Sequence, residues 1–511
     1  MTAFLGLDLG TSGTKALLCG VDGAVLATAT CEHPISMPRP GWSEQNPADW
    51  WTSAVKATQA VMTQSAIVSK AVKGIGLSGQ MHGSVFLNDR REVLRPAILW
   101  NDQRTAAECQ EIEDRAGGRA HLIQMVSNPA FTGFTAPKIL WVRKYEPELF
   151  AQVKQVLLPK DYLRLRLTGE LATEVSDASG TLLLDVIRRR WCEPLLKALD
   201  LDPALLPRCV ESATITGQLT ADAALTLGLQ PGIPVVGGAG DQAAGAVGMG
   251  IVAPGLLSAA LGTSGVIFAH ADRPRTEPGG RVHTMCHAVA DAWHLMGVVL
   301  SAGGSLQWFR NQFCAEETAS AKTRGVDPYD LILESAARAP AGAEGLLFLP
   351  YLTGERHPYS DPSARGAWIG LTARHTKAHL ARAVVEGISF ALRDCLLVMR
   401  GLGCTASQIR LSGGGARSPI WRQWLADIFG QPVALTTSTE GPAFGVALLA
   451  MVGAGAYSTV PGACTATIRT TEVTDPRPAE SSRYEAIHAE YQRLYPLLRE
   501  VNAHLSQQAS A

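Results

Sequence analysis

The stretch Gly6-Leu-Asp8-Leu-Gly10-Thr11-Ser12-Gly13-Thr14-Lys15 contains the letters LGTSG, which return far downstream as Leu261-Gly262-Thr263-Ser264-Gly265. Each copy follows one apolar run and leads into another. Short apolar runs bounded by turn residues predict strands, here over residues 3–9, 15–19, 256–260 and 266–269. A short repeat is weak evidence by itself, but its recurrence in the same strand–turn–strand setting indicates a duplicated α/β unit.

The rest of the chain alternates predicted strands and helices. Asp22-Gly23 is typical of a hairpin turn that leads into a strand over 24–30. Asn46-Pro47 places an N-cap before the first residue of a helix. We expect a pair of strands around Gly76 to Leu87, and a strand over 233–237 that feeds a glycine-rich turn and a helix of small residues. Further helices are expected over 137–150, 159–168, 377–400, 418–429 and 480–505.

Length and composition describe a globular protein of more than one domain. A chain of 511 residues is too long for a single core. We place a boundary near residue 250, where the strand–turn–strand pattern restarts, which gives domains 1–250 and 251–511. The net charge is −1 and no block of like charges is present. Nucleic acid is therefore not expected as a partner.

Cysteine usage and the distribution of charge predict a cytoplasmic protein. The ten cysteines show no Cys-x-x-Cys spacing, which is typical of reduced thiols. Residues 242–271 contain no Asp, Glu, Lys or Arg and are long enough to span a bilayer, but their glycines and Pro254 favour buried turns and strands. Asp8 interrupts the first apolar run and no basic region precedes it, so we expect neither a signal peptide nor a membrane partner.

The two LGTSG turns have the composition of phosphate-binding loops. Glycine lets the backbone approach a ligand closely, and successive N–H groups with Thr and Ser hydroxyls form a concave array of donors. One copy alone would be explained by an ordinary hairpin turn. Asp8 adds a second signal, because an unpaired carboxylate in a strand of Leu and Gly is costly to desolvate. Either Lys15 or a hydrated Mg²⁺ carried by ATP could neutralise it.

Other nucleotide-binding motifs fit less well. The P-loop pattern is absent. Gly74-Ile-Gly76-Leu-Ser-Gly79 matches G-x-G-x-x-G, but it lies inside an apolar strand and does not open a helix. Gly238-Ala-Gly240-Asp241-Gln242-Ala243 matches a relaxed form, but no acidic residue follows about twenty positions on, where a ribose ligand is required. A dinucleotide site is therefore not expected.

Asp241 is the only residue with an ionised side chain between Asp222 and Asp272. The glycines around it leave room for a small ligand beside its carboxylate, which would suit a general base for a hydroxyl group. The same residue could instead be the N-cap of the helix that follows. The sequence leaves both interpretations open.

The combined motifs resemble the FGGY carbohydrate kinases, members of the actin-like, ribonuclease-H-like ATPase superfamily, and within them most closely the xylulokinase group. Besides the second LGTSG turn, the similar stretches are Leu77–Gly83, Ala97–Asp102, Gly133–Lys138, Leu158–Leu163, Phe348–Arg356, Gly366–Leu371, Ala383–Glu386 and Gly413–Ser418. They extend over nearly the whole chain. The resemblance implies an α/β fold of two ribonuclease-H-like domains with an interdomain cleft, a mainly sugar-binding N-terminal domain and a mainly nucleotide-binding C-terminal domain.

The resemblance also implies ATP-dependent phosphorylation of D-xylulose to D-xylulose 5-phosphate, with Mg²⁺. Asp241 would be the catalytic base, and Asp8 would organise Mg–ATP through a water ligand. The implied sugar contacts are Met81, His82, Asp241 and Gln242. The implied nucleotide contacts are Thr11, Lys15, Gly262, Thr263, Gly303, Gln307, Gly414 and Ser418. Gln242 departs from some xylulokinases, which have Asn, and this puts the sugar preference in doubt.

Alternatives stay open at this point. The substrate could be ribulose, gluconate or glycerol instead of xylulose. A non-catalytic actin-like ATPase would share the nucleotide-binding features. The chain could also form a homodimer. His82 could be a structural histidine, and the segment His283–His287 is not expected to bind a metal because it lacks the glutamate of a zinc helix. We expect Asp102 and Arg104 to pair beneath the pocket, with direct sugar contact as the second choice. Trp42–Gln45 is expected to be a helix-entry loop.

Overall fold

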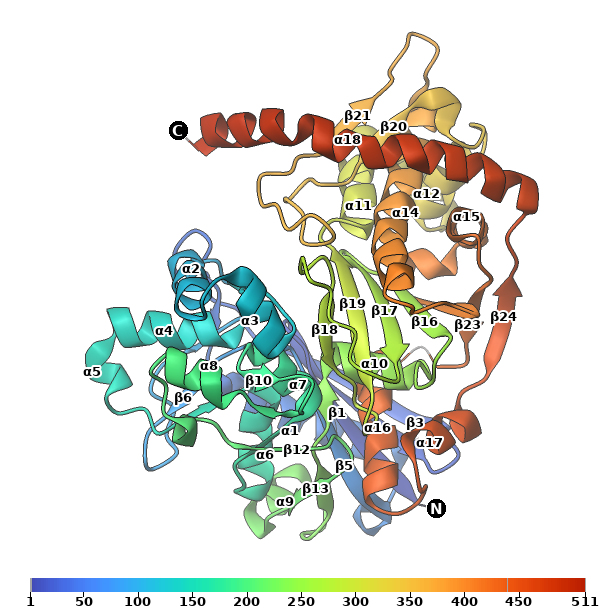
Figure 1. The fold of residues 1–511 in the computed structure, drawn as a ribbon. Helices are drawn as coiled ribbons and strands as arrows, with labels where there is room; N and C mark the ends of the chain where they lie inside the picture. Colours follow the sequence, from blue (N-terminus) through green and yellow to red (C-terminus); the bar gives the residue numbers. More distant parts are fainter. Residues whose placement is uncertain (1, 439, 511) are drawn as a thin grey trace. The chain divides into compact units, whose positions relative to one another are not determined.

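The computed structural model describes residues 2–438 and 440–510 and divides into two compact units. The first unit contains residues 1–253, 271–294 and 438–469, and the second contains 254–270, 295–437 and 470–511. The chain therefore passes close to the expected boundary near residue 250, at Ala253 and Pro254, but it returns twice to the first unit afterwards. Figure 1 shows these later segments by their green and orange-red colours.

The first unit is built on a mixed sheet with the strand order β13-β14-β5-β1-β2-β3. Strand β1 is parallel to β5 and antiparallel to β2, and β14 is parallel to β5. The strands are β1 (Ala3–Leu9), β2 (Gly13–Gly20), β3 (Val25–Glu32), β5 (Val72–Gly79), β13 (Ile215–Gln218) and β14 (Pro234–Val236). The first apolar run thus forms a central strand, with a turn and an antiparallel partner, as the sequence predicted.

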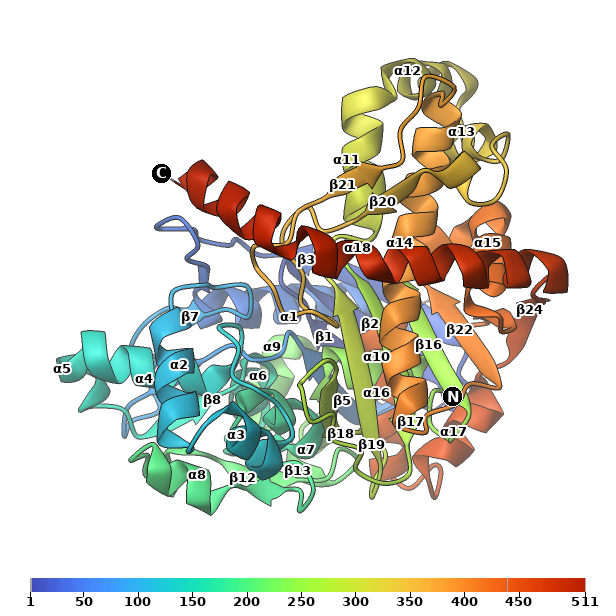
Figure 2. The same cartoon turned by 45° about the horizontal axis from the view of Figure 1, so that its top comes forward.

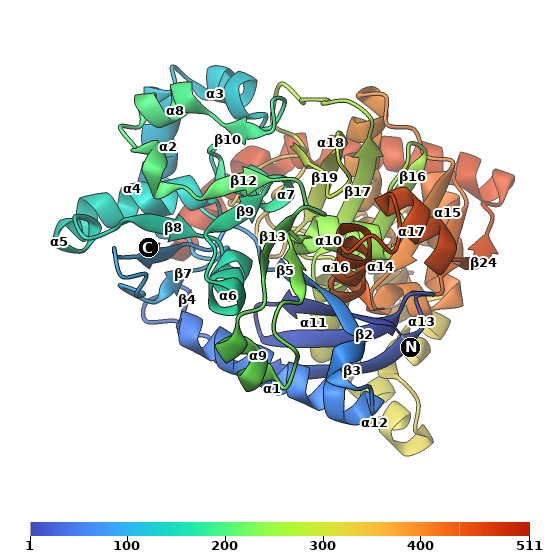
Figure 3. The ribbon, with the colours of Figure 1, turned by 90° about the horizontal axis from the view of Figure 1, so that it is seen from below.

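Helices cover both faces of this sheet (Figure 3). Helix α1 (Pro47–Ser65) packs on β2 and β3, and Asn46 caps it by accepting the Ala48 N–H, as expected. Helix α16 (Gly441–Gly453), apolar on all sides, lies on β1 and β5 beside α10 (Asp241–Gly248). A Cβ atom on Gly6 would be 1.9 Å from the carbonyl oxygen of Ala443, so the glycines of the strands let α16 approach closely. This contact is the physical reason why residues 438–469 belong to the first unit.

The second unit repeats the same topology. Its sheet has the order β24-β23-β22-β16-β17-β19, in which β16 and β17 are antiparallel and β22 is parallel to both β16 and β23. The strands are β16 (Leu256–Leu261), β17 (Gly265–Ala271), β19 (Trp293–Val299), β22 (Gln408–Ser412), β23 (Val433–Thr436) and β24 (Thr470–Thr474). The order and the known directions match those of the first sheet strand by strand, which confirms the predicted duplication.

Helix α14 (Lys377–Gly401) packs on this second sheet where glycines leave space (Figure 2). A Cβ atom on Gly297 of β19 would lie 2.6 Å from the Cβ of Cys395 in α14. The other elements of the second unit are α11 (Gly303–Phe313), α12 (Ala315–Arg324), α13 (Pro328–Ala336), β20 (Leu347–Leu349), β21 (Ala367–Ile369), α15 (Pro419–Phe429) and α18 (Pro478–Ser510). The helices expected over 377–400, 418–429 and 480–505 are therefore present.

Shorter elements complete the first unit. They are β4 (Glu44–Gln45), β6 (Val85–Leu87), β7 (Ala97–Ile98), α2 (Ala106–Arg115), α3 (Arg119–Val126), α4 (Thr135–Tyr145), α5 (Pro147–Phe150), β8 (Gln155–Leu157), α6 (Pro159–Thr168), β9 (Ala172–Glu174), α7 (Val175–Ala178), β10 (Leu184–Asp185), β11 (Arg190–Trp191), α8 (Glu193–Ala198), β12 (Arg208–Val210), α9 (Ala221–Leu227), β15 (Ala239–Gly240), β18 (His283–Cys286) and α17 (Val460–Thr467).

The expected strand pair around Gly76 to Leu87 is wrong in one respect. Strands β5 and β6 both form, but β5 joins the main sheet whereas β6 pairs with β8, because the turn after Gly79 leads the chain away.

Two further expectations concern the whole chain. No disulfide joins any of the ten cysteines, all of which lie within the described residues. Among the helices of the described chain, none combines the length and the apolar character that crossing a bilayer requires. Residues 242–271 form α10, β16 and β17 instead, as expected from their glycines.

Candidate active site

Three strand ends meet at one edge of the first sheet. Ser78 of β5 is the register partner of both Asp8 in β1 and Ala239 in β15, and all three strands run parallel. The segments that follow them are therefore adjacent: the first LGTSG turn, the Gln80–His82 turn, and Asp241 at the start of α10. In open α/β sheets the carboxyl ends of parallel strands are where ligands bind.

Asp8 and Asp241 are the carboxylates at this edge. Burial raises the pKa of Asp8 to about 6. Burial, and then the negative charge of Asp8, raise the pKa of Asp241 to about 7. Two carboxylates that oppose each other's ionisation favour binding of a proton or a cation between them. Within the described residues, Oδ1 of Asp8 is buried and has no hydrogen-bond partner.

Lys15 neutralises Asp8 only in part. It lies opposite Asp8 in the β1–β2 register, and its charge lowers the pKa of Asp8, but burial is the larger effect. Its Nζ is 2.5 Å from Oε2 of Glu440, so the ammonium group is shared. The buried Asp8 oxygen therefore fits a hydrated cation, and Mg²⁺ characteristically keeps its waters while bridging carboxylate and phosphate.

Asp241 is the first residue of α10 rather than its cap. Gly240 occupies the N-cap position, so the prediction that Asp241 could be the N-cap is wrong. The helix begins one residue earlier than an Asp cap would require, because the chain leaves β15 at Gly240. The carboxylate accepts hydrogen bonds from the backbone and the side chain of Gln242, and the residue is partly exposed to solvent. It can therefore reach a ligand at the sheet edge.

Met81 and His82 form a tight turn against the segment that carries Asp241. His82 has a φ of 70°, in the left-handed region that residues other than glycine adopt at a cost. Its Nδ1 donates to the Gly180 carbonyl at 2.6 Å, which makes Nε2 an acceptor in the neutral ring. A Cβ atom on Gly240 would lie 2.9 Å from the Met81 side chain, so these two segments pack directly. The strained, oriented imidazole suits a sugar hydroxyl better than a purely structural role.

A lysine that the sequence analysis quoted only as part of a motif holds this turn. Lys138 Nζ and Thr135 Oγ1 both donate to the backbone carbonyl of His82, at 2.9 and 3.0 Å. Burial lowers the pKa of Lys138 to about 7, against the opposing charge of Asp102. The Gly133–Lys138 stretch was the available signal, but nothing in it indicated that the lysine contacts a backbone carbonyl.

Gln45 ties the first LGTSG turn to the Gln80–His82 turn. Its amide nitrogen donates to the Thr11 carbonyl at 2.6 Å, and its amide oxygen accepts from Gln80 Nε2 at 2.8 Å and from Trp50 Nε1 at 3.0 Å. The hydroxyl of Thr11 accepts from Trp100 Nε1 at 2.9 Å. The sequence analysis assigned none of these roles to Gln45 or Trp100, because a polar side chain that joins two distant turns leaves no periodic signal.

The neighbouring acidic and basic residues pair as expected. Arg104 Nη2 is 2.7 Å from Asp102 Oδ2, and its guanidinium also stacks on Trp42, 3.6 Å from the ring centroid. The expected Asp–Arg pair is therefore present, direct sugar contact by either residue is not tested, and the loop with Trp42 leads into α1 as predicted. In the described part of the chain, no group of three or more His, Cys, Asp or Glu side chains could hold a metal ion.

The second LGTSG turn borders a cavity of about 310 Å³ that lies within the second unit. Six predicted nucleotide contacts line it: Gly262, Thr263, Gly303, Gln307, Gly414 and Ser418. The start of α11 is fixed to the turn, because Gly303 N–H and Gly304 N–H donate to the carbonyls of Gly262 and Thr263, each at 2.9 Å. The walls that the sequence did not predict are Leu261, Leu306, Asp327, Tyr329, Asp330, Leu333, Gly415, Arg417 and Trp421.

Each unit therefore holds one LGTSG turn with its own surroundings. Asp8, Thr11 and Lys15 lie at the sheet edge of the first unit, together with Met81, His82, Asp241 and Gln242. That both LGTSG turns bind phosphate stays a prediction.

Comparison with known proteins identifies relatives that match nearly the whole chain. Residues 3–248 match the N-terminal domain and residues 257–454 the C-terminal domain of the FGGY family of carbohydrate kinases. Xylulose kinase of Escherichia coli strain K12 is 45% identical over 452 residues, which cover 88% of this chain and 90% of that protein. Xylulose kinase of Bacillus subtilis strain 168 is 37% identical over 505 residues, 99% of either chain.

A solved structure agrees with these relatives. The crystal structure of xylulose kinase from Rhodospirillum rubrum has a TM-score of 0.89 and 30% sequence identity, and the match covers 98% of this chain and 99% of that one. The expected two-domain α/β fold of the actin-like ATPase type is confirmed. The chain belongs to the FGGY family of carbohydrate kinases.

Proposed function

We propose that this kinase transfers the γ-phosphoryl group of Mg–ATP to the primary C5 hydroxyl of D-xylulose, giving D-xylulose 5-phosphate and ADP. The observation that carries the proposal is the sheet edge where Asp8 and Asp241 meet the Met81–His82 turn. The substrate is inferred from the relatives, which are xylulose kinases with 45% and 37% identity over most of the chain.

Asp241 is the general base of the proposed reaction. As the C5 oxygen attacks the γ-phosphorus, the hydroxyl proton passes to the carboxylate, the new O–P bond forms, and the bond to the bridging β–γ oxygen breaks. A base is most effective when its pKa lies near the working pH, and burial raises the pKa of Asp241 to about 7. Gln242 donates to this carboxylate and keeps it oriented.

Met81, His82 and Gln242 orient the sugar beside this base. Nε2 of His82, held by the bond from Nδ1 to Gly180, accepts a sugar hydroxyl. Asp8 would hold Mg²⁺ through a water ligand, and the bound ion would neutralise negative charge on the phosphates. Most of the catalytic effect in phosphoryl transfer is positioning and charge neutralisation, so the chain needs no covalent intermediate.

The cavity of the second unit is the proposed nucleotide site. Its 310 Å³ is within the range of small-molecule sites, and its apolar walls, such as Leu306 and Trp421, suit a nucleobase and ribose. Gly303, Gly414 and Ser418 present backbone and hydroxyl groups at its edge. Thr11 and Lys15 are the phosphate contacts that we propose within the first unit.

A substrate panel with an ADP-release readout tests the proposal. D-xylulose, D-ribulose, D-gluconate and glycerol are compared at matched concentrations, and D-xylulose is expected to give the highest kcat/KM. A higher value for another sugar would move the assignment within the family. ATP turnover that no sugar stimulates, together with polymerisation or stimulation by peptides, would indicate a non-catalytic actin-like ATPase.

A further inference from the structure

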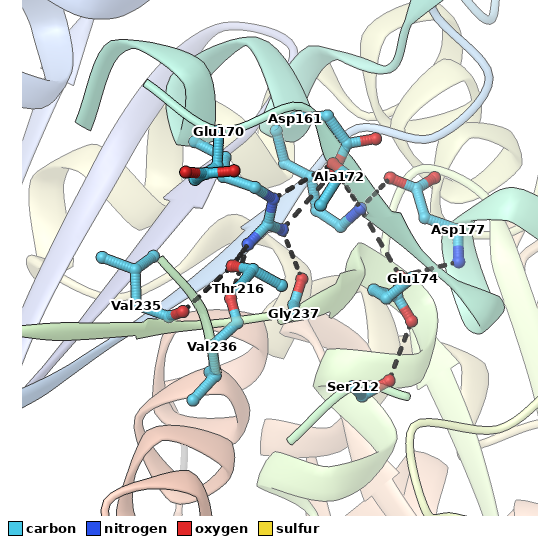
Figure 4. A network of polar contacts seen from close by, with 12 residues as sticks. Asp161, Glu170, Ala172, Glu174, Asp177, Ser212, Thr216, Val235, Val236 and Gly237 are labelled. Atoms are coloured by element: carbon cyan, nitrogen blue, oxygen red, sulfur yellow. Dashed lines mark hydrogen bonds and ion pairs between the residues drawn. The ribbon is translucent and has the colours of Figure 1, made fainter. Parts of the chain in front are cut away.

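A buried network of ion pairs is linked by hydrogen bonds to Val236 and Gly237, a few residues before Asp241 (Figure 4). Lys160 Nζ is 2.9 Å from Asp161 Oδ1, 2.9 Å from Asp177 Oδ2 and 3.5 Å from Glu174 Oε1. Arg164, one turn further along α6, is 3.6 Å from Asp161 Oδ1. All five side chains are fully buried. None of them has a part in the proposed reaction so far.

Arg164 holds the N-terminal side of the glycine-rich turn at residues 237–240, which leads to Asp241. Its Nη1 donates to the Val236 carbonyl at 2.7 Å, and its Nη2 donates to the Gly237 carbonyl at 2.5 Å. Thr216 Oγ1 accepts from the same Nη1 at 2.5 Å and donates to the Val235 carbonyl at 3.0 Å. Figure 4 shows these contacts at the end of β14. The planar guanidinium holds its donors in a fixed geometry toward two successive carbonyls, whereas the donors of an ammonium group rotate.

Glu174 and Ser176 hold the C-terminal side of the same turn. The Gly240 N–H, in the residue before Asp241, donates to Ser176 Oγ at 3.1 Å. Ser176 Oγ in turn donates to Glu174 Oε1 at 3.0 Å. The second oxygen of Glu174 accepts from Ser212 Oγ at 2.8 Å, and the Ser212 carbonyl accepts the Gly238 N–H at 2.8 Å. The Glu174 carboxylate is therefore linked through Ser176 to the Gly240 N–H and through Ser212 to the Gly238 N–H.

The turn itself has no room to move. A Cβ atom on Gly238 would be 1.9 Å from the Leu77 carbonyl oxygen, and one on Gly237 would be 2.8 Å from the Glu211 carbonyl oxygen. Gly238 also has a φ of 73°, which favours glycine. The close packing at Gly237 and Gly238 and the hydrogen bonds to Arg164 and Ser176 therefore act together on the segment that leads to Asp241.

The charges of the network require a fixed arrangement. Three carboxylates face two cations, and burial raises the pKa of Asp177 to about 8 despite the charge of Lys160. A buried ion pair is weak evidence for stability, so the geometry that these residues impose on their neighbours is the property of interest here. That geometry is imposed on residues 236–240.

We propose that Ser176 and Arg164 are positioning residues for the general base Asp241, acting through the Gly240 N–H and the Val236 and Gly237 carbonyls. The proposal rests on the proposed function, since it requires Asp241 to be the base. Removing the charge of Arg164 would leave three carboxylates with one cation and risks unfolding. The hydroxyl of Ser176 is a smaller change and gives the sharper test.

The experiment compares Ser176→Ala with the matched control Ser179→Ala. Both serines are buried, and each hydroxyl accepts one backbone N–H, from Gly240 at 3.1 Å for Ser176 and from Cys286 at 3.0 Å for Ser179. The Ser176 hydroxyl donates to the Glu174 carboxylate and the Ser179 hydroxyl to the Val175 carbonyl, so both changes should lower the melting temperature, Ser176→Ala somewhat more. At saturating sugar and Mg–ATP, kcat should fall about tenfold to a hundredfold in Ser176→Ala, because displacing a catalytic group by 1 Å costs up to about 10²-fold. It should stay within about twofold in Ser179→Ala.

A double-mutant cycle separates positioning from general damage. If Ser176 acts through Asp241, the loss in kcat caused by Ser176→Ala should disappear in the Asp241→Asn background. An equal loss in that background, or equal kcat values for the two serine variants, would overturn the proposal and leave the proposed function intact. Turnover near the wild-type level in Asp241→Asn alone would overturn both, because no base would be left to position.

Discussion

The raised pKa of Asp241 predicts that turnover is lost as the pH falls through neutrality. The base works only as the carboxylate, and burial with the charge of Asp8 raises its pKa to about 7 from the ordinary 3.8. The ionised fraction is then about one-tenth at pH 6 and about nine-tenths at pH 8, so kcat/KM for the sugar should rise about ninefold over this interval. With an ordinary aspartate pKa, the same interval would show almost no change.

The assay is an initial-rate ADP-release measurement from pH 5.5 to 8.5 at a fixed, saturating Mg–ATP concentration. The terminal phosphate of ATP also titrates near neutral pH, so the profile is repeated with the residual activity of Asp241→Asn. Any slope left in that variant belongs to the nucleotide or to other groups. The slope that Asp241→Asn removes belongs to Asp241.

A second readout does not depend on activity. Carbon-13 NMR of labelled aspartate carboxyl groups in the ligand-free protein should show one group, absent in Asp241→Asn, that titrates near pH 7. Asp8→Asn removes the second cause of the raised pKa, so this titration should move to lower pH while burial keeps it above the ordinary value. A wild-type kcat/KM that changes less than twofold between pH 6 and 8, with a carboxyl pKa near 4, would refute the assignment.

Three further predictions concern other parts of the chain. Gln45→Met should lower the free energy of unfolding by about 2–5 kcal/mol in urea denaturation, because it leaves the buried N–H groups of Gln80 and Trp50 without their acceptor; an unchanged midpoint would contradict the role of this bridge. Gly303→Ala should raise KM for ATP about tenfold or more with little change in KM for the sugar, because its Cβ atom would lie 2.4 Å from the Gly262 carbonyl oxygen; Gly401→Ala, where a Cβ atom meets nothing within 4 Å, is the control. Glu355→Gln should reduce the loss of stability that accompanies a rise in pH. Burial raises the pKa of Glu355 from 4.5 to about 8, so the native state keeps a proton that the unfolded chain releases. The stability that this proton provides is complete below about pH 4.5 and is lost as the pH rises through about 8. Denaturation midpoints at pH 5 and pH 8 test this, and an unchanged difference between the two pH values would contradict it.

The sequence by itself predicted the repeated strand–turn–strand unit, and resemblance to a family added six of the fifteen residues that line the cavity of the second unit. Periodicity and turn chemistry are local, so β1, β16 and the two LGTSG turns could be read directly from apolar runs and glycines. Asp8 and Asp241 could also be selected, because a lone carboxylate among apolar and glycine residues is costly unless it serves a purpose. The other nine residues of that lining, among them Leu306 and Trp421, were not predicted, because an apolar wall side chain carries no motif of its own.

Only the tertiary structure decided which distant residues hold these groups. The shared register of Asp8 and Ala239 with Ser78 depends on how three strands align, and a one-residue slip would direct the side chains to the other face. Arg164 and Ser176 contact backbone groups more than 60 positions away, and a backbone carbonyl carries no mark in the sequence. Helix α16 returns to the first unit for the same reason: its fit depends on the space left by glycines on strands far earlier in the chain. Local patterns fix which elements form, whereas the contacts between them depend on distances that exist only once the chain has packed.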